Sequence, residues 1–457
     1  MKIVENILKF KGEIKPILID YRLKLLRYLL VVSGIAAMAM QETGKEKVQI
    51  TLSPSPKVLM TTTIQKAIDS CAQRGGGVVV FTPGTYLCGG IQLRSKVALQ
   101  LEKGALLQGS DKYSDYSRDA FMNGKDLTDV TIRGEGIIDG VDCVNPKGEE
   151  GFRGPHGIRL ANCRNIVIDG ITIKNSANWA INCRHCSDAI INKVIIRGGH
   201  DGLHTRFCED YRVTNCDFRT GDDAFAGNDN RNFIITDCKI NTSCNGFRMG
   251  CYNFTVKRCQ LWGPGESVHK IQKRNNMLSA FVHFSPKDEH PKMESGNWLI
   301  EDCTIDQVDQ VYVYNYKNGL WQTGKPVTKV QFKKINATGI LGAFNIQGDS
   351  ARRFHLYIED SSFSFREGAD YKAGHFEGAR LLSPSLLNCV DFDLLRLKEV
   401  TFSKKENMPL LNCQSGNSVT LEDVNLVTGN VSLPYSIERV GMTKEKKVRA
   451  NGQEVIK

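Results

Sequence analysis

The fold is decided by residues 166–261, where a short apolar octet recurs five times: IVIDGITI (166–173), AIINKVII (189–196), YRVTNCDF (211–218), FIITDCKI (233–240) and FTVKRCQL (254–261). The octets begin 23, 22, 22 and 21 residues apart, and glycine, asparagine and aspartate supply the turns between them. A β-rich repeat of this length without a helical segment predicts a solenoid of stacked β-coils, because one coil cannot bury its apolar face alone. WLIEDCTI (298–305), LYIEDSSF (356–363) and VTLEDVNL (419–426) continue the pattern after longer insertions.

Most of the cysteines fall on two columns of this repeat. The sixth octet position holds Ile171, Val194, Cys216, Cys238, Cys259 and Cys303, and the position three before each octet holds Cys163, Cys186, Cys208, Asn230 and Cys251. Small apolar columns are expected to fill the interior, where free cysteine acts as a compact hydrophobe. The CRHC sequence at 183–186 resembles a redox or metal motif, but no second CxxC with zinc spacing accompanies it. We therefore expect structural cysteines, with no metal site and no cofactor.

The residues before the repeats predict a cap and an export segment. Ile64, Ala67, Ile68 and Cys71 recur at helical spacing after threonines that could serve as the N-cap, so a short helix is expected to cover the open end of the solenoid. Residues 1–40 contain a basic segment, an apolar run and small residues, in the order of a secretory signal. We expect a secreted or periplasmic protein with no other membrane contact, and a retained anchor is the alternative. The expected organisation is an export segment with an N-terminal extension (1–40), a cap region (41–90), a β-helix (91–430) and a C-terminal tail (431–457).

The formal net charge of +10 indicates little about partners, because residues 1–40 hold seven basic and three acidic residues and so contribute 7 − 3 = +4. No compact basic and aromatic patch is present in the sequence, so we expect no nucleic-acid partner. The protein is expected to act as a monomer.

The repeat also brings three aspartates together. Asp201 and Asp223 each lie seven residues before a member of one interior column, Cys208 and Asn230, so they are expected to stack on adjacent coils beside Asp222. Repulsion among gathered carboxylates raises the pKa of at least one, which supplies a protonated acid beside ionised bases. This arrangement suits protonation of a leaving oxygen and activation of a water. Calcium binding and turn chemistry are the alternatives.

Residues from about 61 to 270 resemble the polygalacturonase-type pectin hydrolases, glycoside hydrolase family 28. The stretches that carry the resemblance are IQKAIDSCAQRGGGVVVFTPGTYLCGGIQLRSKVALQLEKGALLQGS (64–110), GEGIIDG (134–140) and RGPHGIRLANCRNIVIDGITIKNSANWAINC (153–183). The resemblance implies an all-β, right-handed parallel β-helix that hydrolyses a pectic or related polysaccharide or oligosaccharide with inversion.

Two family motifs fall on the aspartates. The Asn-Thr-Asp-Gly pattern falls on residues 199–202, and Gly-Asp-Asp falls on residues 221–223. By this resemblance Asp222 would be the general acid, and Asp201 and Asp223 would hold the attacking water as bases.

Other family positions are changed. The family His-Gly falls on Asn245-Gly246, and Arg-Ile-Lys, which grips the substrate carboxylate, falls near His269-Lys270-Ile271. Guanidinium is the best planar partner for a carboxylate, so its loss weakens the case for galacturonate in the cleaved subsite. A rhamnosyl, galactosyl or otherwise substituted pectic unit is the alternative. The candidate substrate-binding residues are His200, His204, Asn245, Arg248, His269 and Lys270.

Two other functions stay open. One is a glycan-binding β-helix whose catalysis was lost with the histidine and arginine. The other is a polysaccharide lyase, which needs a base and a cation to neutralise the uronate. The expectation of few arginines and lysines near the acidic cluster argues against the lyase.

Overall fold

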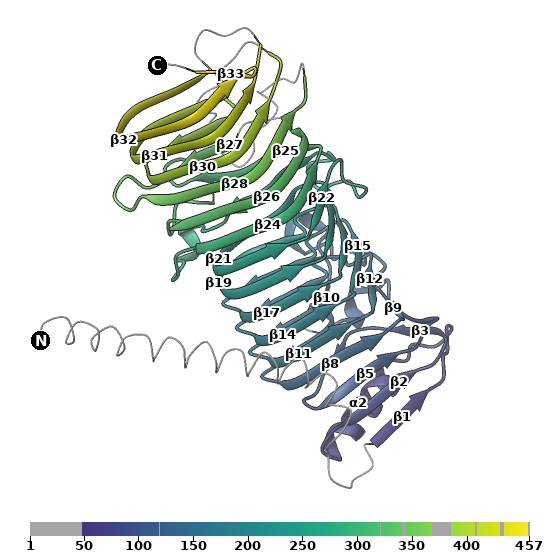
Figure 1. Ribbon diagram of the computed structural model, residues 1–457. Helices are drawn as coiled ribbons and strands as arrows, with labels where there is room; N and C mark the ends of the chain where they lie inside the picture. Colours follow the sequence, from purple (N-terminus) through teal and green to yellow (C-terminus); the bar gives the residue numbers. More distant parts are fainter. Residues whose placement is uncertain are drawn as a thin grey trace, which may run out of the picture. The chain divides into compact units, whose positions relative to one another are not determined.

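The computed structural model describes residues 48–117, 119–319, 321–340, 344–367, 385–406, 409–429 and 434–455. In these residues successive strands pair in parallel from coil to coil, and β33 alone pairs antiparallel, with β32. The strands stack as parallel rungs along the unit Val48–Lys457 (Figure 1). This confirms the predicted all-β parallel β-helix. The expected export segment lies outside the described residues.

The coils present three faces, each a parallel ladder. The first face begins with β1 (Val48–Leu52), β2 (Gly77–Phe81), β5 (Val97–Leu101), β8 (Thr128–Gly134), β11 (Arg164–Asp169), β14 (Ser187–Asn192) and β17 (Glu209–Thr214). The second contains β3 (Gly84–Cys88), β6 (Ala105–Gly109), β9 (Ile137–Asp139), β12 (Thr172–Lys174), β15 (Ile195–Gly198), β18 (Asp217–Thr220), β20 (Lys239–Thr242) and β22 (Gln260–Trp262). The third contains β4 (Ile91–Gln92), β7 (Ala120–Lys125), β10 (His156–Ala161), β13 (Ile181–Arg184), β16 (Leu203–Arg206), β23 (Met277–His283), β25 (Val308–Asn315), β27 (Phe344–Gln347) and β29 (Leu387–Val390).

Longer strands bend from one face into the next. They are β19 (Phe225–Thr236), β21 (Asn245–Lys257), β24 (Gly296–Asp306), β26 (Lys329–Ile340), β28 (Phe354–Phe365), β30 (Phe392–Ser403), β31 (Leu411–Val427) and β32 (Tyr435–Ala450), with β33 at Gln453–Glu454. The helical segments are α2 (Thr61–Gln73) and the short 3₁₀ turns Tyr113–Asp115, Glu149–Gly151 and Lys287–Glu289.

Asparagine and aspartate make sharp backbone bends in strands of the repeat for a conformational reason. Asp210, Asn232 and Asn253 occupy the left-handed region, with φ of 59°, 58° and 57°, which these two residue types tolerate better than other side chains. Their side chains form a ladder, since Asn232 Nδ2 donates to Asp210 Oδ1 (2.9 Å) and Asn253 Nδ2 donates to Asn232 Oδ1 (2.8 Å). These bends therefore repeat in register from coil to coil.

The interior is built from the predicted columns. Cys216, Cys238, Cys259 and Cys303 are buried, and all fifteen cysteines are free and buried. An aromatic ladder runs beside them: the ring of Phe247 stacks on Phe225 at 4.7 Å and on Phe281 at 5.0 Å. The CRHC cysteines therefore pack in the core, as the column pattern predicted.

The ends of the solenoid differ in detail from the expectation. Helix α2 buries Ile64, Ala67, Ile68 and Cys71 and packs beside β1, β2, β4 and β5, so it covers the first coils. Its N-cap is Met60 without a side-chain hydrogen bond, because Thr61 Oγ1 instead accepts from the Gly89 N–H at 2.8 Å.

The stack also extends past both expected boundaries. Strands β1 and β2 already pair before residue 91, and β32 pairs with β31 along the segment expected to be a tail. The tail was missed because its charged residues, TKEKKVR (443–449), conceal the strand pattern on an outermost coil. No helix of the described segments is long and apolar enough to cross a membrane.

Candidate active site

A cavity of 570 Å³ lies against the third face, beside the coils that carry the three aspartates. Its wall includes all three of them, Asp201, Asp222 and Asp223, together with Trp179 and Trp321. One oxygen of each carboxylate lies within 4.8 Å of one oxygen of each of the others. The cavity is thus an acidic site with aromatic walls.

The parallel register stacks Asp201 and Asp223. Leu203 of β16 pairs with Phe225 of β19, and the Gly202 N–H donates to the Asp223 carbonyl at 2.9 Å. Both aspartates lie two residues before these paired strand residues, so both occupy the same turn on adjacent coils. The interval between them is one coil, as the repeat predicted.

Asp222 sits in the turn between β18 and β19, and two threonines fix its backbone. The hydroxyls of Thr220 and Thr242 donate to the Asp222 carbonyl at 2.6 and 2.5 Å. Its own carboxylate accepts the Asp223 N–H at 3.0 Å and faces His269 Nε2 at 3.5 Å. The side chain is 18% exposed, whereas those of Asp201 and Asp223 are 2% and 1% exposed. Asp222 is therefore the most exposed of the three carboxylates in the cavity wall.

The two buried carboxylates are held by different partners. His204 Nδ1 bonds to Asp201 Oδ2 at 2.9 Å, and the His204 ring stacks on Trp179 with 3.6 Å between centroids. Asp223 Oδ1 accepts both the side-chain and backbone N–H groups of Asn245, at 2.8 and 3.2 Å, and Asp223 Oδ2 pairs with Arg248 Nε. Both oxygens of Asp223 are thus occupied.

Burial and mutual charge separate the acidities of the cluster. Burial and the charges of Asp222 and Asp223 raise the pKa of Asp201 well above its usual value. Burial raises the pKa of Asp223 as well, although Arg248 acts against it. For Asp222 burial also acts upward, but the hydrogen bond from His269 and the charge of Arg248 act in the opposite direction, and the pKa of Asp222 is lowered. Of the three carboxyl groups, Asp201 is therefore the one that burial and charge most favour in the protonated form, whereas the resemblance implied an acid at Asp222.

His204 stays neutral beside these carboxylates. Burial, followed by the charge of Arg248, lowers its pKa well below the usual value. The neutral ring carries its hydrogen on Nδ1 and donates it to Asp201. His204 thus acts as a neutral donor that orients Asp201.

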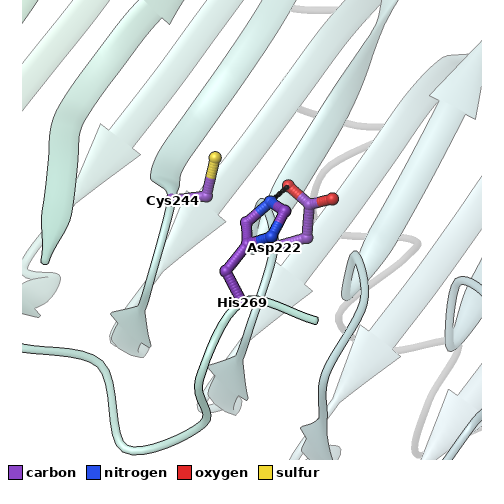
Figure 2. Close-up of side chains that lie close together, drawn as sticks. All are labelled: Asp222, Cys244 and His269. Atoms are coloured by element: carbon purple, nitrogen blue, oxygen red, sulfur yellow. Dashed lines mark ion pairs between the residues drawn. The ribbon is translucent and has the colours of Figure 1, made fainter. Parts of the chain in front are cut away.

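Asp222, Cys244 and His269 have donor atoms within 4.8 Å of one another, a set that could ligate a transition metal (Figure 2). The contacts of His269 favour another role. Its Nδ1 accepts the backbone N–H groups of Ile271 and Gln272 at 3.2 and 3.1 Å, so the ring hydrogen belongs on Nε2, facing Asp222. A metal-bound histidine normally donates from its second nitrogen instead. His269 is therefore arranged as a hydrogen-bond donor to Asp222.

The six residues expected to bind substrate divide into two groups. His204, Arg248 and His269 line the cavity, whereas His200, Asn245 and Lys270 are not part of its wall. His200 is buried against Phe152, and burial lowers its pKa to about 3. Lys270 is paired with Asp142, and Asn245 is fully buried beneath Asp223. Asn245 therefore acts on the site through its hydrogen bonds to Asp223.

Sequence reasoning missed most of the cavity wall. Five arginines line it (Arg153, Arg159, Arg184, Arg206 and Arg248), so the expectation of few cations near the cluster was wrong. Those nearest the acids are neutralised: Arg153 pairs with Glu150, Arg206 with Glu289 (2.9 Å) and Arg248 with Asp223. The guanidinium of Arg248 also stacks on Phe284, 4.1 Å from the ring centroid. Arg159 and Arg184 could have been found from the sequence, because they occupy outward-facing positions of β10 and β13 in the register. The wall residues that come from inserted loops could not, because the loops do not follow the repeat.

Three comparisons bear on the origin of this site. Residues 78–252 match the model of the glycosyl hydrolases family 28. The chain is 31% identical over 148 residues to an exo-poly-alpha-D-galacturonosidase of Dickeya chrysanthemi, a match covering 27% of this chain and 24% of that enzyme. The chain thus spans about a quarter of the length of that relative.

Solved structures share the fold at low identity. A hyperthermoactive exopolygalacturonase of Thermotoga maritima is 17% identical with a TM-score of 0.58, covering 72% of this chain and 89% of that one. A family 28 exopolygalacturonase of Yersinia enterocolitica is 14% identical with a TM-score of 0.54, covering 91% of this chain and 80% of that one. Residues 78–252, which carry the three aspartates, thus resemble glycosyl hydrolase family 28.

Proposed function

We propose that the protein is a glycoside hydrolase that cleaves a pectic or related polysaccharide or oligosaccharide by acid and base catalysis with inversion. The observation that carries the proposal is the carboxylate cluster, in which Asp222 reaches the cavity while Asp201 and Asp223 lie behind it. The match of residues 78–252 to the family 28 model and the partial match to an exo-poly-alpha-D-galacturonosidase support the same reaction class.

The roles of the three aspartates follow from their exposure. Asp222 donates a proton to the leaving oxygen because it is the carboxyl group that a substrate can touch. Asp201 and Asp223 hold the attacking water, since burial keeps them from reaching a sugar carbon. Removal of a proton from that water by a carboxylate makes it a competent nucleophile.

Loading of the proton on Asp222 is coupled to substrate binding. The three groups interact strongly, so they titrate together and share a proton. A sugar oxygen that covers Asp222 removes the remaining water from its exposed part, and desolvation favours the neutral carboxyl form. The shared proton then moves from the Asp201 side towards Asp222, which becomes the acid at the time of reaction.

Inversion is supported by the partners of the buried carboxylates. In ordinary inverting pairs the carboxyl groups stand about 6.5–9.5 Å apart, and retaining pairs about 5–5.5 Å. The oxygens here lie within 4.8 Å, so spacing alone would suggest the retaining geometry. A retaining nucleophile must reach the anomeric carbon, however, and both oxygens of Asp223 are engaged while Asp201 is 2% exposed. A water between them is the more accessible nucleophile.

Two alternatives make different predictions. A lyase would use a cation to neutralise the uronate, but Arg153, Arg206 and Arg248 are already paired with acidic side chains. A binding protein without catalysis would release no product. Incubation with a panel of pectic polymers and oligosaccharides distinguishes these cases, because hydrolysis creates reducing ends and elimination creates an unsaturated end that absorbs ultraviolet light.

The Asp222→Asn substitution tests the assignment of the acid. The amide is almost isosteric but cannot donate a proton to the leaving oxygen, so kcat should fall about 10²–10⁴-fold. Asp210→Asn is a matched control, because Asp210 is an exposed residue of β17 whose left-handed conformation suits asparagine. Turnover of Asp222→Asn within threefold of the unchanged protein would overturn the assignment.

We also propose that the hydrolase is exported, on the signal-like order of residues 1–40. Polysaccharide substrates outside the cell are consistent with this proposal. Detection of the protein in the medium or periplasm, cleaved near Ala39, would support it.

A further inference from the structure

A second depression lies on coils beyond the catalytic cavity, and the proposed reaction does not use it. It has a volume of 810 Å³, and none of its described wall residues belongs to the cavity. We call it the C-terminal groove and define it by the wall residues Tyr316, Gln347, Asp391, Gln414 and Arg439. Its coils, from β25 to β32, belong to the green and yellow part of the solenoid in Figure 1.

The parallel register runs through the C-terminal groove one coil at a time. One residue of each coil pairs with the next in the order Asn315, Gln347, Val390, Gln414 and Glu438. Tyr316 and Arg439 follow the first and the last of these residues. Four steps of about 4.8 Å between parallel strands give the groove a length of about 19 Å. This length suits an extended chain better than a compact small molecule.

Side-chain amides in the groove hold one another in place. Arg439 Nη2 donates to Gln414 Oε1 at 3.2 Å, and Gln414 Nε2 donates to Asn412 Oδ1 at 3.2 Å. Asn412 Nδ2 donates in turn to Asn388 Oδ1 at 3.2 Å. An amide has two N–H groups and two acceptor positions, so within the described residues Gln414 keeps one of each for a ligand. The groove therefore presents an ordered donor and acceptor on its central coil.

Gln347 lies outside this chain of hydrogen bonds. Its side chain is 7% exposed, and its Oε1 has no hydrogen-bond partner among the residues that the structure describes. An unsatisfied buried acceptor lowers stability, so a protein with no use for it would gain from an apolar side chain there. A hydroxyl group of a ligand in the groove would donate to this oxygen. The unpartnered acceptor is thus a second indication, besides the groove itself, of a bound ligand.

The side chains of the groove fit an uncharged ligand that is rich in hydroxyl groups. The formal charges of the wall balance, because they come from two basic and two acidic residues: Lys317, Arg439, Asp349 and Asp391. Tyr316 and Val390 supply the apolar side chains of the described wall, which is too little to anchor the apolar side chains of a peptide. A sugar chain offers hydroxyls to the amides and an apolar C–H face to the tyrosine ring.

The C-terminal groove begins close to the catalytic cavity. Along the third face the strands that carry them pair in the order Phe225, Phe247, Phe281 and Tyr312. Strand β25 therefore lies three coils, or about 14 Å, beyond the start of β19. The loop after β25 contributes Tyr316 to the groove and Trp321 to the cavity wall. One polysaccharide chain can thus contact both.

We propose that the C-terminal groove is a second binding site, which takes an uncharged stretch of glycan and holds it beside the catalytic cavity. One sugar unit of an extended chain is comparable in length with the strand spacing, so the groove accommodates about four units. Binding in the groove does not depend on the roles of the three aspartates, and a protein that hydrolyses no polymer would still show it.

The test measures binding of galactotetraose and cellotetraose, two uncharged probes, and of tetragalacturonate by titration calorimetry. The full chain with Asp222→Asn serves as background, so that turnover does not consume a probe. Adding Gln347→Leu should weaken binding of an uncharged probe about tenfold, because it removes the acceptor that the hydroxyl satisfies. Leucine leaves no unpaired oxygen in the core, so the urea midpoint of unfolding should stay the same or rise. A purely structural role of Gln347 predicts no loss of binding.

A second pair of variants covers the case in which Gln347→Leu does not fold. Tyr316→Ala should weaken binding of the same probe, whereas Tyr316→Phe keeps the ring and should bind as the background does. Gln331→Leu is the matched control, because Gln331 is a half-buried glutamine of β26 outside the groove wall. The inference is overturned if neither uncharged probe binds, if Gln347→Leu and Tyr316→Ala bind as tightly as the background, or if only tetragalacturonate binding is weakened.

Discussion

His283 allows a quantitative prediction about stability in acid. This last residue of β23 is 0% exposed, its Nε2 donates to the Lys325 carbonyl at 2.8 Å, and its Nδ1 has no hydrogen-bond partner among the described residues. Burial lowers its pKa from 6.5 to about 4, with the Lys325 bond acting in the opposite direction. Protonation would place a charge in the core, so the folded protein resists it.

Proton linkage gives the sign and the size of the change in the free energy of unfolding with pH. Between pH 6.5 and about 4 the unfolded chain binds a proton at His283 that the folded chain does not, so the free energy of unfolding falls as the pH falls. A shift of 6.5 − 4 = 2.5 units corresponds to about 3 kcal/mol, because each unit is worth about 1.36 kcal/mol. This destabilisation is absent at pH 7 and complete near pH 4.

The perturbation is His283→Gln, which keeps an N–H for the Lys325 carbonyl but does not titrate. Urea unfolding of both proteins at pH 7, 6, 5 and 4 gives their free energies of unfolding. From pH 7 to pH 4 the unchanged protein should lose about 3 kcal/mol more free energy of unfolding than the variant. Between pH 7 and 8 it should stay constant, because histidine is neutral in both states. Parallel curves from pH 7 to 4 would show that the folded protein does not resist protonation of His283.

Two further predictions concern the core. Titration of thiols in denaturant without reductant should find all fifteen cysteines reduced, and Cys238 in a disulfide would contradict the column of free cysteines. Phe247→Ala should lower the free energy of unfolding by about 3–5 kcal/mol, because it removes the ring stacked between Phe225 and Phe281. A loss below about 1 kcal/mol would show that the aromatic ladder contributes little to stability.

The repeat made the fold and the stacking of two aspartates predictable. A parallel solenoid fixes which residues lie above one another, so the 22-residue interval placed Asp201 over Asp223 without further information. The cysteine columns follow from the same register. The spacing of residues along the chain determines these features, and that spacing can be read from the sequence.

The rest of the site depends on loops that the repeat does not describe. Arg153, Glu289 and Trp321 come from insertions whose lengths vary, so no register relates them to the aspartates. The placement of His269 beside Asp222 also depends on the loop after β22, and it lowers the pKa of the carboxyl expected to be the acid. Such contacts result from tertiary packing, which spacing along the chain cannot predict.

We propose that Asp201 and Asp223 act through a water instead of attacking the sugar themselves. The most direct measurement is the anomeric configuration of the first product, followed by proton NMR before mutarotation, on whichever polymer of the panel is cleaved. Attack by water from the face opposite the leaving oxygen predicts the inverted anomer. Initial release of the retained anomer would mean a covalent intermediate on one of these carboxylates, and would contradict direct attack by water.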